Sequence, residues 1–210
     1  MLPKLKEKYD FKKALKPLLN PSTDKPQIVS VPSMQFLAME GMGSPNNNPV
    51  FEAAVSALYG CAYSIKFGRK KAGVEPEYSV QPLEGLWWVE GTDPADYLQT
   101  PQSEWHWKLL IGQPDFVTTA DLQTAQAELL QKKGLDASAV QLTRWEEGLV
   151  VQILYIGPYK DEHPTISRMH AWTHEHGYTL HGLHHEIYLG DPRKTAPDKL
   201  KTILRQPVKI

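Results

Sequence analysis

Three short motifs occur twice in this sequence and in the same order, which limits the fold more than any other feature. The pairs are FLAMEG at 36–41 with QILYIG at 152–157, LEGLWW at 83–88 with LHGLHH at 180–185, and LIGQPDF at 110–116 with LRQPVKI at 204–210. Ordered repetition of this kind indicates a duplicated supersecondary unit. Two similar halves are expected to have a pseudo-two-fold axis and a concave seam, and such seams are favoured positions for ligand pockets.

Hydrophobic spacing predicts a β-α-β-β order for the first half. The run 27–40 is apolar and partly alternating, which is typical of a strand. Residues 50–71 place apolar side chains three and four apart and end in cations, which predicts a helix. Two further strands are predicted over 78–90 and 104–112.

A second amphipathic helix is predicted over 119–133, and the pattern then repeats. The expected elements are a strand or hairpin over 140–157 turning at Glu147-Gly148, a helix over 164–176, and strands over 182–189 and 202–209. The fold class expected is therefore α+β, with duplicated β-α-β-β halves. Residues 1–26 are expected to form an N-terminal flanking arm, and residues 27–210 a single ligand-binding domain.

Charge and cysteine usage argue against several classes of protein. The 23 Lys and Arg nearly balance the 24 Asp and Glu, whereas duplex binding usually needs a basic excess, so no direct nucleic-acid partner is expected. The single cysteine, Cys61, lies in an apolar helical run and is expected in the core of a protein from a reducing compartment. No apolar run approaches the ~18 residues that span a bilayer. We therefore expect no membrane partner and a cytoplasmic location.

The six tryptophans and nine tyrosines are candidates for stacking on a flat ligand, because they supply large rigid faces with a polar tip. Trp87 and Trp88 are neighbours on a predicted strand, so one is expected in the core and the other in the seam. Trp105 and Trp107 share one face of a predicted strand. Their spacing is compatible with a position in the core and with a position in the wall of a ligand site. Tyr78, close to them in this arrangement, favours the wall.

The strand HHEIYL contains the main candidate for acid/base chemistry. Alternation places His184, Glu186 and Tyr188 on one face, and Ile187 and Leu189 on the other. We expect the Ile187 face to pack under the helices, which leaves Glu186 and Tyr188 facing the seam. A carboxyl against aromatic walls would have a raised pKa and could act as a general base or as counterion to a cation. A solvated glutamate on a strand face explains the same spacing.

Tyr155 and Met39 occupy matching positions in the repeated motif at 36–41 and 152–157. They are therefore expected to face one another across the pseudo-two-fold axis. A tyrosine that caps the core accounts for Tyr155 equally well, so the sequence leaves both interpretations open.

Seven of the eight histidines fall between 163 and 185, and His170 and His174 have the spacing at which two imidazoles on a helix can bind one metal. No HExxH or similar pattern accompanies them, so surface histidines are favoured over a zinc site and no metal is expected. A phosphate-binding glycine loop, a GxSxG elbow and a CxxC pair are also missing from the sequence. No cofactor is expected.

Taken together, the motifs resemble those of the stand-alone GyrI-like small-molecule-binding proteins over almost the whole chain. The segments that carry the resemblance are DFKKALKPLLNP, EGMGSPN, AVSALYGCAYSIKF, PLEGLWW, LLIGQPDFVT, IGPYKDEHPTISRMH, HHEIYLGDPRK and TILRQPV. The resemblance implies a GyrI-like (SOUL-like) fold with a hydrophobic groove, shared with ligand-sensing domains of multidrug-responsive regulators. This chain departs from those regulators in lacking a helix-turn-helix segment.

The resemblance also implies a function, because some members of the group hydrolyse the cyclopropane ring of genotoxic natural products. Carried over here, Glu186 would deprotonate a water and Tyr155 would position it or polarise the dienone carbonyl. The ligand would be held by Trp87, Trp88, Tyr78, Trp105, Trp107, Met39 and Tyr188. The alternative is a non-catalytic module that sequesters cationic aromatic drugs. The expected partner is thus a planar hydrophobic small molecule, with a homodimer as the candidate assembly.

Overall fold

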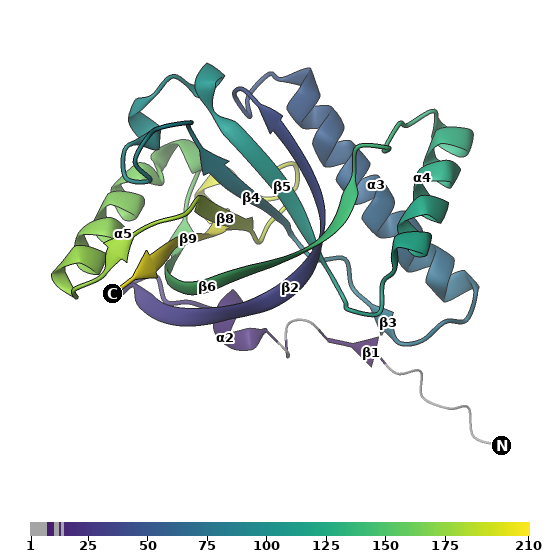
Figure 1. Cartoon of the computed structure of the whole chain (residues 1–210), viewed down its shortest axis with the longest axis horizontal. Coiled ribbons are helices and arrows are strands. Elements are labelled where there is room, and N and C mark those ends of the chain that lie inside the picture. The colour runs from purple at the N-terminus through teal and green to yellow at the C-terminus, as the bar shows by residue number, and fades with distance from the viewer. Residues whose placement is uncertain (1–7, 11–12, 14) are drawn as a thin grey trace.

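The computed structural model describes residues 8–10, 13 and 15–210 and contains a closed antiparallel β-barrel (Figure 1). Its six strands are β2 (Gln27–Met42), β4 (Leu83–Trp88), β5 (His106–Gln113), β6 (Gln141–Ile156), β8 (His184–Tyr188) and β9 (Lys201–Lys209). They are arranged in the order β6-β2-β5-β4-β8-β9, and pairing of β6 with β9 closes the barrel. The predicted α+β class is confirmed.

Three helices cover the barrel, with α3 (Pro49–Lys71) and α4 (Thr119–Lys133) on the right of Figure 1 and α5 (His163–Glu175) on the left. Helix α3 begins where the side chain of Asn48 accepts hydrogen bonds from the amides of Val50 and Phe51. Helix α4 begins at a capping box formed by Thr118 and Asp121. The buried face of α3 includes Cys61, as predicted.

Shorter elements complete the fold. They are β1 (Lys8–Tyr9), α2 (Lys16–Leu19), β3 (Glu77–Tyr78), β7 (Thr179–Leu180) and four single-turn helices at Tyr97–Gln99, Gln102–Glu104, Tyr159–Asp161 and Pro197–Lys199. Each strand of the first half has a counterpart in the second: β2 corresponds to β6, β4 to β8 and β5 to β9. If every strand is exchanged with its counterpart, the same strands remain neighbours round the barrel. This order is compatible with two similar halves, and their origin by duplication stays a prediction.

The hairpin considered at Glu147-Gly148 is a single bent strand instead. β6 pairs with β2 from Gln141 to Gln152 without reversing. Gly148 has φ 75°, a conformation that glycine adopts at no steric cost. This residue breaks the alternation, so Glu147 and Gln152 both reach Arg205 although they are five positions apart.

The N-terminal segment closes one end of the barrel. Leu18 is buried and its carbonyl oxygen accepts a 2.7 Å hydrogen bond from Arg205 Nη2. Gln152 donates to the carbonyl oxygen of Pro17. The flanking arm predicted over 1–26 lies partly outside the described residues, but residues 15–19 pack against the barrel.

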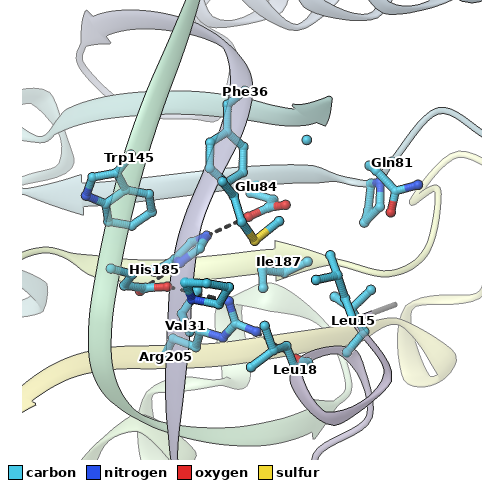
Figure 2. Close-up of a pocket in the computed structure, with 16 residues that line it drawn as sticks. Leu15, Leu18, Val31, Phe36, Gln81, Glu84, Trp145, His185, Ile187 and Arg205 are labelled. Carbon is cyan, nitrogen blue, oxygen red and sulfur yellow. Dashed lines mark hydrogen bonds and ion pairs between the residues drawn. The ribbon is translucent and has the colours of Figure 1, made fainter. Parts of the chain in front are cut away.

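Four buried ionisable side chains form a linked series inside the barrel (Figure 2). His185 Nε2 lies 3.0 Å from Glu84 Oε2, and His185 Nδ1 lies 2.9 Å from Glu147 Oε1. Arg205 Nη1 lies 3.5 Å from Glu147 Oε2. Burial lowers the pKa of His185, but the two carboxyls outweigh it and raise the value to about 9. We refer to Glu84, His185, Glu147 and Arg205 as the barrel network.

The cavity beside the barrel network is small. Its volume is ≈ 20 Å³, and Ile187, Phe36 and Leu18 are among its lining residues (Figure 2). A cavity needs a volume of roughly 10–15 Å³ to hold one water molecule. This cavity therefore accommodates a water molecule but no organic ligand.

Candidate functional site

Glu186 lies on the outer face of the barrel, on the side covered by the helices. Its neighbours in the sheet are Gly85 on β4 and Leu204 on β9. The expectation that Ile187 would pack under the helices is wrong, because Ile187 points into the barrel and lines its cavity. In a closed barrel the inner face is also apolar and buried, a possibility that alternation alone does not distinguish. Glu186 is only 7% exposed.

A second buried carboxyl, that of Glu162, lies close enough to Glu186 for the two to interact. Glu162 occupies the N-cap position of α5, yet its side chain makes no capping hydrogen bond. Burial and the charge of Glu186 raise the pKa of Glu162 to about 10, so Glu162 holds a proton at neutral pH. The two glutamates form an acid/base pair in which Glu162 is protonated, and we refer to them as the carboxyl pair.

Stability is expected to fall as pH rises from 6.5 to 9. The pKa of His185 is about 9 in the folded protein and 6.5 ordinarily, so its contribution of roughly 3 kcal/mol is fully present below pH 6.5 and lost as pH rises through 9. The raised pKa of Glu162 acts in the same direction above its ordinary value of 4.5. Urea unfolding at pH 6.5 and 9 measures the loss.

The matched variant for this measurement is Glu162→Gln, which removes the Glu162 contribution and leaves the His185 contribution. Its free energy of unfolding should therefore depend less steeply on pH than that of the wild type. A free energy of unfolding that is constant or increases across this range would contradict the raised pKa values of both groups.

Tyr188 connects the carboxyl pair to the aromatic residues above it. Its hydroxyl lies within electrostatic range of Glu186 and accepts a 3.1 Å hydrogen bond from Trp87 Nε1. Burial, followed by the charges of Glu186 and Glu162, raises the pKa of Tyr188 well above its ordinary value. A Cβ on Gly85 would lie 2.8 Å from Trp87 Nε1 and 3.1 Å from the Tyr188 hydroxyl. Glycine at this position therefore allows both groups to lie against the strand.

Aromatic rings from six segments pack together on the same side of the barrel as the carboxyl pair. Phe51 stacks on Trp87 with centroids 5.9 Å apart, and meets Trp107 edge-on at 5.3 Å. Trp105 lies 5.8 Å from Trp87 and 5.3 Å from Tyr97. Tyr159 meets Tyr188 at 5.4 Å. We define the aromatic cluster as Phe51, Trp87, Tyr97, Trp105, Trp107, Tyr159 and Tyr188.

Several buried polar atoms around the carboxyl pair have no hydrogen-bond partner among the described residues. These are Tyr97 Oη, Glu162 Oε2, His170 Nε2, both ring nitrogens of His184, Thr202 Oγ1 and Gln206 Oε1. Buried polar groups are normally hydrogen-bonded, and exceptions often mark functional positions. The site therefore combines an apolar aromatic wall with buried polar groups that have no partner among the described residues.

The residues proposed from the sequence lie in different places. Trp87, Trp105, Trp107 and Tyr188 belong to the aromatic cluster on the Glu186 side of the barrel. Met39 shares their face of the sheet, beside Leu109. These positions are compatible with ligand contact, which stays a prediction for each residue.

Three other predicted residues have partners elsewhere. Trp88 points to the opposite face from Trp87 and stacks on His106. The hydroxyl of Tyr78 bonds to Gln113, at the far end of β5. The hydroxyl of Tyr155 donates a 2.9 Å hydrogen bond to the carbonyl oxygen of Pro158. Their proposed roles therefore require contacts that differ from those in this structure.

The sequence did not indicate Glu162, Tyr97 or Tyr159 as site residues. Glu162 directly precedes the His163-Pro164 helix start, where an acidic residue normally serves the helix terminus. Tyr97 and Tyr159 lie on single-turn helices without hydrophobic periodicity. Tyr159 and Glu162 both lie in IGPYKDEHP, a segment that carries the family resemblance. That resemblance could have marked them as site residues.

The expectation that the clustered histidines lie on the surface is wrong for three of them. His170, His184 and His185 are buried, at 8%, 1% and 1% exposure. His184 and His185 alternate on β8, so one reaches the carboxyl pair and the other the barrel network. Within the described part of the chain, no three His, Cys, Asp or Glu side chains gather into a group that could hold a metal ion.

Comparison with known proteins places the chain in a family. A model of the GyrI-like small-molecule-binding domain matches residues 113–209. A Listeria innocua protein of known structure, described as an uncharacterized conserved protein, is 39% identical, with a TM-score of 0.87 over 97% of this chain and 100% of its own. The chain belongs to the GyrI-like family.

Two further structures resemble this GyrI-like protein. One, described as a hydrolase from Listeria innocua, is 37% identical, with a TM-score of 0.82 over 97% of this chain and 100% of its own. The other is the EcmrR C-terminal domain, which shares only the fold at 11% identity, with a TM-score of 0.55 over 88% of this chain and 97% of its own. A comparison with curated proteins found no match. No helix in the described ranges of the GyrI-like chain has the length and apolar character to cross a membrane.

Proposed function

We propose that this GyrI-like protein binds flat hydrophobic small molecules between the aromatic cluster and the carboxyl pair, and hydrolyses cyclopropane-bearing electrophiles with Glu186 as general base. The observation that carries the proposal is the carboxyl pair itself. Burying two carboxyls beside each other costs stability, and strongly raised pKa values of this kind are concentrated at functional sites. The 37% identical Listeria protein is described as a hydrolase, which supports a hydrolytic activity in general.

A planar guest has to displace one of the rings to reach the carboxyl pair. A ring inserted between two others needs roughly 7 Å, twice the ~3.5 Å contact distance of carbon atoms. The centroids of Phe51 and Trp87 are only 5.9 Å apart. We therefore propose that Phe51, which is less buried than Trp87, swings away on binding.

The proposed reaction adds one water across the strained ring. Glu186 takes a proton from the water, and the oxygen attacks a methylene carbon of the cyclopropane. The ring bond breaks and its electron pair moves to the dienone carbonyl oxygen, which becomes a phenolate and then takes a proton. Tyr155 would polarise that oxygen after releasing the carbonyl oxygen of Pro158.

A binding module for cationic aromatic compounds is the second candidate. The carboxyl pair holds one proton between two carboxyls, so it keeps a negative charge that could neutralise a cation. Aromatic faces attract cations as well. In this function Glu186 would act only as a counterion.

The test is turnover of a spirocyclopropyl-cyclohexadienone by the wild-type protein, followed by absorbance and mass spectrometry. We expect a product heavier by one water, formed faster than in a protein-free control. Tryptophan fluorescence with neutral and cationic planar compounds reports binding separately. Quenching without any turnover would contradict the hydrolase, and quenching by the cationic compounds alone would favour the binding module.

A further inference from the structure

We propose that His184 and His170 form the route by which the proton taken up by Glu186 leaves the buried site. The inference rests on the proposed hydrolysis, because that reaction delivers a proton from water to Glu186. It assigns positioning and proton-transfer roles to two buried histidines.

His184 is the first step of the route. Its side chain is fully buried, and its Nε2 lies 3.4 Å from Glu186 Oε1. The ring stacks on Tyr97, with centroids 5.4 Å apart and planes inclined by 28°. Neither ring nitrogen has a hydrogen-bond partner among the described residues. A neutral imidazole can accept a proton at one nitrogen and release one from the other.

His170 is the second step and leads to the surface of α5. Its Nε2 is buried and also has no hydrogen-bond partner within the described chain. Among charged groups, His184 contributes most to the lowered pKa of His170, and His174, Asp93 and His163 affect it less. The last three are exposed. His170 therefore lies within electrostatic range of the buried His184 and of groups that are in contact with solvent.

Burial and the neighbouring histidines keep the imidazole of His170 neutral. Burial, followed by His184, His174 and His163, lowers its pKa to about 4, and Asp93 opposes the shift only in part. At neutral pH the ring is therefore free to take a proton from His184. A proton that arrives at one nitrogen is released from the other, so His170 carries it only transiently.

The other neighbours of Glu186 are poor acceptors for the proton. Glu162 already holds one, because burial and Glu186 raise its pKa to about 10. Tyr188 keeps its hydroxyl proton, because its pKa is raised well above the ordinary value. The phenolate oxygen forms at the opposite end of the substrate and takes its proton from solvent. The proton therefore leaves Glu186 for His184, and the overall reaction consumes only water.

The experiment compares His184→Gln and His170→Gln with His181→Gln, a matched variant of an exposed histidine in the same segment. We expect each of the first two changes to lower kcat about tenfold or more at low buffer concentration, with KM within about twofold. Raising the concentration of imidazole buffer should restore kcat, because the buffer replaces the lost carrier. Circular dichroism confirms that each variant is folded.

Equal kcat values for all three variants, or a loss that buffer does not restore, would overturn the route. If the wild type does not turn over, the proposed function fails and a second measurement decides on the route. In protein with nitrogen-labelled histidine, the ring proton of His184 should exchange with water more slowly in His170→Gln than in wild type. An unchanged exchange rate would overturn the route independently of catalysis.

Discussion

Turnover by Glu186→Gln is expected to be lower than that of the wild type by roughly 10²–10⁴-fold, the usual contribution of a general base. Glutamine keeps the size of the side chain, but it has no basic oxygen to take the proton of a water. Affinity for a neutral planar ligand should stay within about twofold, because the aromatic cluster is unchanged. Steady-state kinetics and tryptophan fluorescence measure the two quantities.

The matched control is Glu40→Gln, which alters an exposed glutamate of β2 that pairs with Lys108. Its kcat and affinity should equal those of the wild type. If Glu186→Gln retains full turnover, Glu186 is not the base. If instead only the affinity for cations falls, Glu186 is a counterion and the protein is a binding module.

Glu147→Gln should lower the free energy of unfolding by about 3–5 kcal/mol, the usual loss when one partner of a buried ion pair is removed. Glu147 accepts from both His185 and Arg205, and all three side chains are buried. Burial raises the pKa of Glu147, but His185 and Arg205 outweigh this effect and hold the value below the ordinary one. Removing the charge leaves Arg205 with neutral polar partners among the described residues, including Gln152 and the Leu18 carbonyl oxygen.

Glu146→Gln provides the control for that measurement, because Glu146 is the adjacent residue on β6 and is exposed. Its free energy of unfolding should lie within about 0.5 kcal/mol of the wild type. Urea unfolding near neutral pH measures both variants. Equal losses for Glu146→Gln and Glu147→Gln would show that the barrel network adds nothing beyond ordinary surface charge.

The helices and most strands followed from local patterns in the sequence. Helix α4 has the predicted bounds, and α3 and α5 begin one residue before theirs. Their apolar spacing, caps and terminal cations act within one or two turns, so the sequence contains the information locally. The repeated motifs likewise predicted corresponding strands in the two halves. The candidate role of Glu186 came from alternation on β8 together with the family resemblance.

The closed barrel could not be read from the same patterns. Both faces of β8 are buried, one against the barrel interior and the other against the helix side, so alternation did not identify which face Ile187 occupies. The bend at Gly148 also depends on distant contacts. Pairing with β2 keeps β6 running through a glycine that in isolation resembles a turn.

The sequence by itself determined the α+β class, the order of the elements and the presence of Glu186 among aromatic residues, because these depend on spacing along the chain. Only the tertiary structure decided that Glu162 meets Glu186, that His184 lies beside them, and that His185 belongs to the barrel network. Glu162 and Glu186 are 24 positions apart and lie on different elements. Their shared proton arises from burial and mutual charge, which exist only after the chain has folded.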